Sequence, residues 1–166
     1  MTAYSSTMDT ATGPFTAVVA EDGAVLASGW TASLDDLLPV IALTLRPTEI
    51  RPRQELGPVS AAVRAYHDGD LGAIDDIEVR QRSGAFIQRA WDALRTVPPG
   101  KPTSYTDFAA LAGRPTAIRA AASACARNAA ALFVPCHRIL RSDNTLGGFR
   151  WGIEVKRWLL AHESPA

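Results

Sequence analysis

The side chain best suited to chemistry in this sequence is a cysteine followed directly by a histidine and an arginine. Cys136, His137 and Arg138 stand together in the stretch 133–140, FVPCHRIL. Neighbouring positive charge favours the thiolate, which is the nucleophilic form of cysteine. Adjacent side chains of an extended segment point in opposite directions, so a bridging water is one way to join Cys136 to His137. Taken alone the pair is weak support for catalysis, because most buried cysteines are unreactive small hydrophobic residues.

The chain around this stretch is predicted to be helical. Residues 85–96 place apolar side chains on one face of a helix, which the run VPPG at 97–100 ends. Ser104 is the expected N-cap of a helix over 105–112, Gly113 ends it, and a further helix follows over 117–127. Two short helices across a glycine-containing turn form either a helix-turn-helix or an ordinary helical hairpin.

The first half of the chain has a different pattern. After a polar leader, residues 15–20 and 24–30 read as two strands of a hairpin around Gly23. Leucine and isoleucine at helical spacing predict a helix over 34–45, with Ser33 as its N-cap. We expect a loop over 46–58, a short helix over 59–67 and a strand over 74–79. The boundary between two lobes is placed near residue 80.

Charge divides between the same two parts of the chain. Residues 1–80 contain five basic and twelve acidic side chains, a net charge of −7, whereas residues 81–166 contain twelve basic and five acidic ones, a net charge of +7. A basic lobe beside an acidic one suggests a polyanionic partner for the basic lobe, with an affinity that falls as salt is added. Chance variation of surface charge explains the same numbers, so charge alone favours nucleic acid only slightly.

Cysteine usage and the absence of targeting patterns indicate a cytoplasmic protein. The two cysteines, Cys125 and Cys136, do not form a disulfide framework. The first fifteen residues lack the basic and apolar regions of a signal peptide, and no apolar run approaches the ~20 residues of a membrane helix. The spacing of the cysteines and histidines fits no structural zinc pattern, so no metal is expected.

Motifs over residues 84–163 resemble those of the O6-alkylguanine-DNA alkyltransferases, also called methylated-DNA–protein-cysteine methyltransferases. The resemblance rests on motifs in the family's order and spacing. These are FIQRAW at 86–91, the PPG turn at 98–100, Ser104-Tyr105, Arg119, Asn128, PCHR at 135–138, GGFRWG at 147–152 and KRWLLAHE at 156–163.

The resemblance implies a fold and an activity. The expected fold is an α/β lobe over 1–80, RNase H-like with a small antiparallel sheet, followed by a mainly α-helical lobe over 81–166 with a helix-turn-helix. The expected activity is irreversible, single-turnover transfer of an alkyl group from O6-alkylguanine in double-stranded DNA to Cys136, with O4-alkylthymine as a candidate second substrate. The protein would act as a monomer in the minor groove, without a cofactor.

The family also implies roles for individual residues. Glu163 would hold His137, which would take the Cys136 proton through a water and leave a thiolate to attack the alkyl carbon. The residues expected to contact DNA are Tyr105, Arg119, Ala120, Ala121, Ser123 and Ala124. Arg119 would fill the gap left by the flipped nucleotide, Tyr105 would press on its phosphate, and the small side chains would allow close approach.

The expected substrate pocket contains Asn128, Cys136, Ile139, Phe149, Arg150 and Trp151. The backbone carbonyls of Cys136 and Ile139 would accept from the guanine amino group. Asn128 would brace the active-site strand. Donors near Phe149 and Arg150, together with the Tyr105 hydroxyl, would stabilise the leaving oxygen.

Three positions depart from the common family pattern. Ala129 stands where a proline is common, which leaves the approach to the active-site strand less rigid. Phe149 lacks the hydroxyl of the usual tyrosine. Trp151 replaces a glycine found in some members, and we expect its bulk to disfavour large adducts. The first lobe has no cysteine, so the zinc ligands of some relatives are missing.

Three alternative functions compete with alkyl transfer. The first is a non-catalytic alkylated-DNA lesion binder, but such proteins lack the motif cysteine. The second is a helix-turn-helix regulator with a reactive cysteine, but its recognition helix would need polar side chains to read bases, and here it carries mostly alanine. The third is a thiol hydrolase built from Cys136, His137 and Glu163, which the helix-turn-helix context disfavours.

Overall fold

The computed structural model describes residues 1–165, which fold into two units. The first unit contains a sheet of four strands. This unit consists of Met1–Arg82 together with Ala129–Phe133, and the second of Ser83–Asn128 and the chain from Val134 onward. The sequence places the boundary near residue 80 and treats each lobe as one continuous segment. In the structure, a segment just before the reactive cysteine belongs to the first unit instead.

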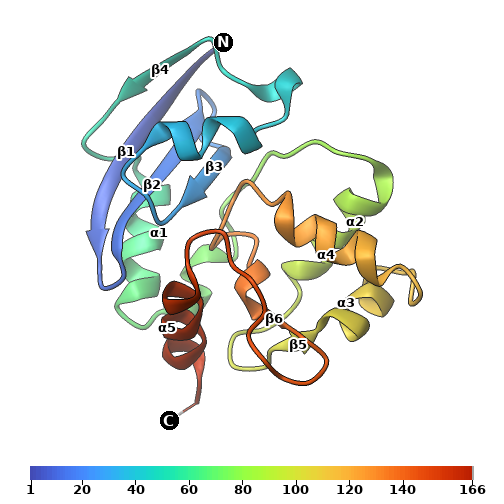
Figure 1. The fold of residues 1–166 in the computed structure, drawn as a ribbon. Helices are drawn as coiled ribbons and strands as arrows, with labels where there is room; N and C mark the ends of the chain where they lie inside the picture. Colours follow the sequence, from blue (N-terminus) through green and yellow to red (C-terminus); the bar gives the residue numbers. More distant parts are fainter. Residues whose placement is uncertain (166) are drawn as a thin grey trace. The chain divides into compact units, whose positions relative to one another are not determined.

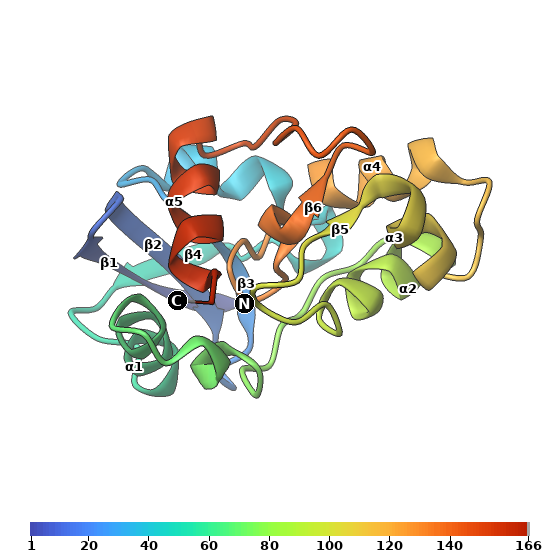
Figure 2. The same ribbon diagram turned by 90° about the horizontal axis from the view of Figure 1, so that it is seen from below.

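The sheet of the first unit is mixed, not antiparallel as expected. Its strands are β1 (Thr2–Thr10), β2 (Gly13–Ala20), β3 (Val25–Gly29) and β4 (Glu49–Pro52), in the order β3-β2-β1-β4. β1, β2 and β3 pair antiparallel, but β4 lies parallel to β1. Helix α1 (Pro58–His67) covers one face of this sheet, and the segment between β3 and β4 crosses the other (Figures 1 and 2).

The sequence misses β1 because its side chains are small and polar. The strand TAYSSTMDT falls within the predicted polar leader, yet it pairs with β2 along its whole length and with β4 at its start. Buried Ser5 and Ser6 replace the large apolar residues that usually mark a strand. The hydroxyl of Ser6 donates to the carbonyl oxygen of Gln54 at 3.0 Å, which satisfies one of these buried polar groups.

The helix predicted over 34–45 is wrong. The segment forms three short 3₁₀ turns, Leu34–Asp36, Leu38–Val40 and Leu43–Leu45. Pro39 has no amide hydrogen to donate and its ring excludes a continuous α-helix, which explains the break. The apolar residues of the predicted face, Leu37, Ile41 and Leu45, are buried nevertheless. The periodicity thus identifies the buried side chains but not the backbone that carries them.

The strand predicted over 74–79 is also wrong. Leu71–Ile74 form a 3₁₀ turn, and only Val79 pairs with a strand, through a single bridge to Val25. The predicted loop over 46–58 contains β4, whereas the predicted helix over 59–67 agrees with α1.

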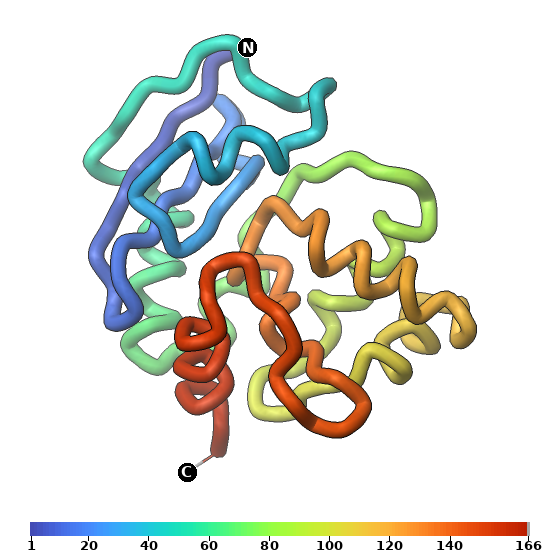
Figure 3. Tube along the Cα trace, viewed as in Figure 1, coloured from blue at the N-terminus to red at the C-terminus, as the bar shows by residue number. Residues whose placement is uncertain are grey.

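The second unit contains four helices and a short parallel pair of strands among its described residues. The helices are α2 (Ala85–Leu94), α3 (Tyr105–Leu111), α4 (Ile118–Ala126) and α5 (Ile153–Glu163), and the strands are β5 (Thr103–Ser104) and β6 (Ile139–Leu140). Helices α2, α3 and α4 pack against one another. The predicted N-cap forms, because the Ser104 hydroxyl accepts from the Asp107 amide at 3.0 Å. Figure 3 follows the chain from β6 through the loop of residues 141–152 into α5.

The segment Ala129–Phe133 lies along the edge of β3. The Ser28 amide donates to the Ala129 carbonyl at 2.8 Å, the Ala131 amide donates to the Ser28 carbonyl at 3.2 Å, and the Ser28 hydroxyl donates to the Ala131 carbonyl at 2.7 Å. All five side chains are buried. Leu132 has a φ of 79°, a left-handed conformation that costs a non-glycine residue about 1–3 kcal/mol. The hydrogen bonds to Ser28 hold the segment in this strained path.

Helical spacing places some alanines of α4 in the interior of the second unit. A larger side chain at such a position should destabilise the fold, whereas one at an exposed alanine should not. Ala121 is fully buried where α4 packs against α2 and α3, whereas Ala110 on α3 is exposed. Ala121→Leu should lower the free energy of unfolding by about 1–3 kcal/mol through overpacking. Ala110→Leu is the matched control and should leave it nearly unchanged. Urea denaturation followed by circular dichroism measures both, and equal stabilities would contradict the assigned packing.

Candidate active site

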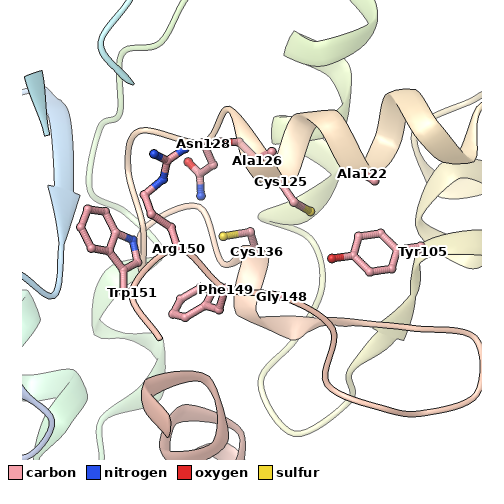
Figure 4. A pocket seen from close by; sticks show the side chains of 10 residues that line it. All are labelled: Tyr105, Ala122, Cys125, Ala126, Asn128, Cys136, Gly148, Phe149, Arg150 and Trp151. Atoms are coloured by element: carbon pink, nitrogen blue, oxygen red, sulfur yellow. Dashed lines mark hydrogen bonds between the residues drawn. The ribbon is translucent and has the colours of Figure 1, made fainter. Parts of the chain in front are cut away.

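A pocket in the second unit has the reactive cysteine in its wall. Its volume is about 410 Å³. The lining residues come from α3, from the end of α4, from the active-site turn and from the loop before α5. They are Tyr105, Ala122, Cys125, Ala126, Asn128, Cys136, Gly148, Phe149, Arg150 and Trp151. Figure 4 shows the sulfur atoms of Cys136 and Cys125 and the Tyr105 hydroxyl directed into this space.

A 3₁₀ turn, Cys136–Arg138, carries the cysteine. The Cys136 amide donates to the Val134 carbonyl at 2.8 Å, and the Asn128 side-chain amide donates to the same carbonyl at 2.7 Å. Asn128 lies just beyond α4, so its side chain joins that helix to the chain entering the turn. Beyond the turn, Ile139 and Leu140 form β6, which pairs with β5 ahead of α3. The cysteine is therefore anchored on both sides.

Buried charges lie behind the turn. His137 Nε2 lies 2.8 Å from Glu163 Oε2, and Arg138 donates to the same carboxylate through Nε and Nη2, each at 2.9 Å. The third Arg138 donor, Nη1, bonds to the Val97 carbonyl at 2.8 Å. The side chains of His137, Arg138 and Glu163 are at most 3% exposed. This network joins α5 to the active-site turn and to the end of the α2 region.

The network sets the protonation of His137. Burial opposes ionisation of Glu163, but its hydrogen bonds to His137 and Arg138 prevail and lower its pKa to about 2. Burial lowers the pKa of His137, so the ring is neutral at pH 7. A neutral ring beside an ionised carboxylate carries its hydrogen on Nε2, which leaves Nδ1 as the basic atom. Nδ1 is buried and has no hydrogen-bond partner among residues 1–165.

The state of Cys136 differs from the sequence expectation. Neighbouring positive charge predicts a thiolate, but burial raises the pKa of the Cys136 thiol. A hydrogen bond with Asn128 and the charges of Lys156 and Arg150 act in the opposite direction without reversing the shift. The resting nucleophile is therefore the neutral thiol, because desolvation of the sulfur outweighs the adjacent cations. It needs a base such as His137 to become reactive.

Two further pocket residues are held neutral. Burial raises the pKa of Tyr105 to about 12, and the nearby thiols Cys125 and Cys136 contribute in the same direction. Tyr105 therefore keeps a hydroxyl proton that it can donate. Burial also raises the pKa of Cys125 well above its usual value. Cys125 is accordingly a poorer nucleophile than its presence in the pocket suggests.

The residues expected to contact DNA fall into two groups. Arg119 is exposed, and Tyr105, Ala120 and Ser123 are half-buried. Ala121 and Ala124 are fully buried, so the structure does not present their side chains for the predicted contact with DNA. They face the interior because they lie three residues apart on the side of α4 that packs against α2 and α3. The Ala124 carbonyl accepts from the Trp91 indole at 2.9 Å.

The predicted pocket residues are mostly brought together. Asn128, Cys136, Phe149, Arg150 and Trp151 line the pocket, whereas the Ile139 side chain is fully buried outside this lining. The sequence missed the role of Arg138 as the second partner of Glu163, although its place in the PCHR motif was a signal. It also missed buried Lys156, which the repeated basic residues of α5 conceal.

The described residues offer no metal site and no membrane-spanning helix. Within residues 1–165, no group of three or more histidine, cysteine or acidic side chains is placed to hold a metal ion. No helix in that range combines the length and apolarity needed to cross a membrane.

Comparison with known proteins identifies relatives of both the sequence and the fold. A family model described as "6-O-methylguanine DNA methyltransferase, DNA binding domain" matches residues 85–165. The chain is 51% identical over 83 residues to the "Bifunctional transcriptional activator/DNA repair enzyme Ada" of Escherichia coli, a match that covers 50% of this chain and 23% of that protein. The chain thus spans about a quarter of that relative's length.

Two other relatives match more of their own length. The chain is 33% identical over 103 residues to the "Probable methylated-DNA--protein-cysteine methyltransferase" of Acanthamoeba polyphaga mimivirus, covering 62% of this chain and 68% of that protein. The structure described as "Crystal structure of Mycobacterium tuberculosis OGT in complex with DNA" matches with a TM-score of 0.80 and 29% identity, covering 98% of this chain and 96% of that chain. The similarity in fold therefore includes the first unit, where motifs are absent.

The network around Glu163 predicts a loss of stability with a characteristic pH dependence. Glu163→Gln leaves the buried Arg138 charge without its counter-ion and should lower the free energy of unfolding at pH 7 by about 3–5 kcal/mol. In the parent protein the Glu163 pKa is about 2, against a reference value of 4.5. Its stabilising contribution is therefore complete above pH 4.5 and is lost as the pH falls toward 2.

Urea denaturation at pH 7, 5 and 3 tests this prediction. The parent should lose stability between pH 5 and 3 more steeply than Glu163→Gln does. Glu154→Gln is the control on the same helix, because Glu154 forms an exposed ion pair with Arg157, and it should change little. A Glu163→Gln protein as stable as the parent would show that the network contributes nothing.

Proposed function

Because the chain belongs to the O6-alkylguanine-DNA alkyltransferase family, as its motifs predict, we propose that it repairs DNA by moving the alkyl group of O6-alkylguanine onto Cys136. The observation that carries this proposal is a thiol in a pocket, on the same turn as a histidine whose tautomer is fixed by a buried carboxylate. That arrangement supplies a nucleophile, a proton acceptor and a space for the flipped guanine. The transfer is stoichiometric, because a thioether has no hydrolytic route back to the thiol.

The proposed reaction is a displacement at the alkyl carbon. His137 Nδ1 takes the thiol proton through a bridging water, and the sulfur forms a bond to that carbon as the bond from carbon to guanine O6 breaks. The electron pair of the broken bond remains on guanine, which gains a proton and becomes the unmodified base. Tyr105 keeps its hydroxyl proton at neutral pH and can donate it toward the departing base. His137 then releases the thiol proton to water and Tyr105 regains its proton from water, so the net reaction moves one proton from the thiol to guanine.

Nucleotide flipping is required because the alkylated oxygen of a paired guanine is out of reach of a thiol inside a protein pocket. In our proposal α3 and α4 act as a helix-turn-helix in the minor groove. Exposed Arg119 enters the stack, and Ala120 and Ser123, which are half-buried, allow the backbone to approach. In the proposal the Ile139 carbonyl accepts from the guanine amino group through its second lone pair, since its first already accepts from Lys156 at 2.8 Å.

The finer description of the first unit and of assembly is also part of the proposal. The strand order β3-β2-β1-β4, with three antiparallel strands and a parallel fourth, supports an RNase H-like arrangement. We propose that one copy of the chain acts alone, because thiol, base, carboxylate and pocket all belong to one unit of one chain.

Intact-protein mass spectrometry tests the transfer. After incubation with a duplex containing one O6-methylguanine, the protein should gain the mass of one methylene group. Cys136→Ser should abolish the gain, whereas Cys125→Ser, which removes the other pocket thiol, should retain it. A bound duplex with an intact lesion and no mass gain would instead identify a damage-binding protein.

The pocket predicts a preference for small adducts. Trp151 is half-buried and lines the pocket, so Trp151→Gly should enlarge it. The variant should raise the rate of transfer from O6-benzylguanine relative to O6-methylguanine by about tenfold or more, a value typical of pocket contacts of a few methylene groups. Single-turnover kinetics on the two lesions in the same duplex give the ratio. Equal ratios in the parent and the variant would mean that Trp151 does not limit adduct size.

A further inference from the structure

Within the described residues 1–165, a buried lysine of α5 has no acidic partner. Lys156 is 1% exposed, yet none of the ion pairs among residues 1–165 includes it. A buried ammonium group without a counter-ion is costly and is rarely retained without a purpose. The nearby Glu163 carboxylate is already shared by His137 and Arg138. Stability alone therefore does not explain Lys156.

Its hydrogen bonds join two parts of the pocket. Lys156 Nζ donates to the Ile139 carbonyl at 2.8 Å and to the Gly148 carbonyl at 3.4 Å. Ile139 directly follows the turn that carries Cys136, and Gly148 lines the pocket at the start of the loop that holds Phe149, Arg150 and Trp151. The same loop is tied to the end of α4, where the Arg150 guanidinium donates to the Ala126 carbonyl. The lysine thus connects the loop to the residue that follows the active-site turn.

The charge of this lysine acts on the pocket thiols. Burial lowers the pKa of Lys156, while the thiols of Cys136 and Cys125 raise it and Arg141 lowers it. Reciprocally, Lys156 lowers the pKa of both thiols against the larger effect of burial. The other titratable groups around the site are Tyr105 on α3, His137 on the turn and Glu163 on α5. The arginines that act on these groups are Arg138, Arg141 and Arg150.

We propose that Lys156 is a positioning residue for alkyl transfer: its ammonium group fixes the pocket loop to the active-site turn and keeps an uncompensated positive charge beside Cys136. When the thiol loses its proton to His137, that charge gains an anionic partner. The energetic cost of burying Lys156 is thereby relieved in the reactive state and not in the resting one. The claim that Lys156 positions the loop for alkyl transfer rests on the proposed function. The claim that its charge acts on the Cys136 thiol does not depend on that function.

Three substitutions separate the two contributions. Lys156→Met keeps an unbranched side chain but removes both the charge and the donor. Lys156→Gln keeps a donor without charge, and Lys156→Arg keeps both with a larger head group. Lys101→Met is the matched control, because Lys101 is the other lysine of the chain and is exposed. Thermal unfolding confirms that each protein is folded before it is assayed.

The first readout is the pH profile of Cys136 alkylation by iodoacetamide, with peptide mass mapping to distinguish it from Cys125. This measurement needs no DNA. Lys156→Met and Lys156→Gln should shift the profile to higher pH by about one unit, as expected when a neighbouring positive charge is lost. Lys156→Arg and Lys101→Met should follow the parent. An unshifted profile in Lys156→Met would overturn the electrostatic role.

The second readout is the single-turnover rate of methyl transfer at saturating duplex. Lys156→Met should be slower by about tenfold to a hundredfold, as for a displaced reacting group, with little change in duplex affinity. Lys156→Gln should retain more of the rate than Lys156→Met, because its amide can still hold the loop. Transfer by Lys156→Met at the parent rate would overturn the positioning role. If the parent itself transfers nothing, the proposed function fails, while the iodoacetamide profiles still decide the effect of the charge.

Discussion

The Glu163 carboxylate is the group on which the active site depends. It accepts from His137 and, through two bonds, from Arg138, and all three side chains are shielded from water. The two partners have different consequences. Arg138 provides the counter-charge that makes a buried carboxylate tolerable, and His137 receives from it a defined tautomer. One residue near the end of the last helix therefore both holds the turn in place and prepares its base.

The same network explains why the nucleophile rests as a thiol. The His137 ring is neutral and donates to Glu163, and Arg138 donates to Glu163 and to the Val97 carbonyl, so the two residues that follow Cys136 in the sequence do little for its sulfur directly. Burial raises the thiol pKa, and the groups that oppose this come from elsewhere in the chain, namely Asn128, Lys156 and Arg150. Neighbours in sequence are in this case not the neighbours that matter electrostatically. Because the thiolate is the reactive form, a thiol that stays protonated until a base acts on it also reacts slowly with other electrophiles and with oxidants.

The sequence predicts the second unit better than the first, for physical reasons. Ser104 and Gly113 delimit α3 by local capping chemistry, and the motif residues Asn128, Cys136, Phe149, Arg150 and Trp151 do line one pocket. In the first unit, β1 is built from small polar residues whose strand character arises from pairing with β2 and β4. Pro39 converts a helical pattern of apolar residues into 3₁₀ turns. The burial of Ala121 and Ala124 depends on which face of α4 packs against α2 and α3. Alanine is small enough to lie on a buried or an exposed face, so the residue type does not identify the buried face.

The segment Ala129–Phe133 gives the two units a shared chain rather than a simple linker. It leaves the second unit after Asn128, runs along β3 with Leu132 in a strained conformation, and returns two residues before Cys136. The half of the chain that carries the recognisable motifs therefore includes a segment that belongs to the first unit. If it were cut free at residue 83, five apolar residues would lose their hydrogen-bonding edge at the very approach to the nucleophile. Ser28, in a strand without any catalytic motif, thus contributes three hydrogen bonds to the segment that leads into the active-site turn.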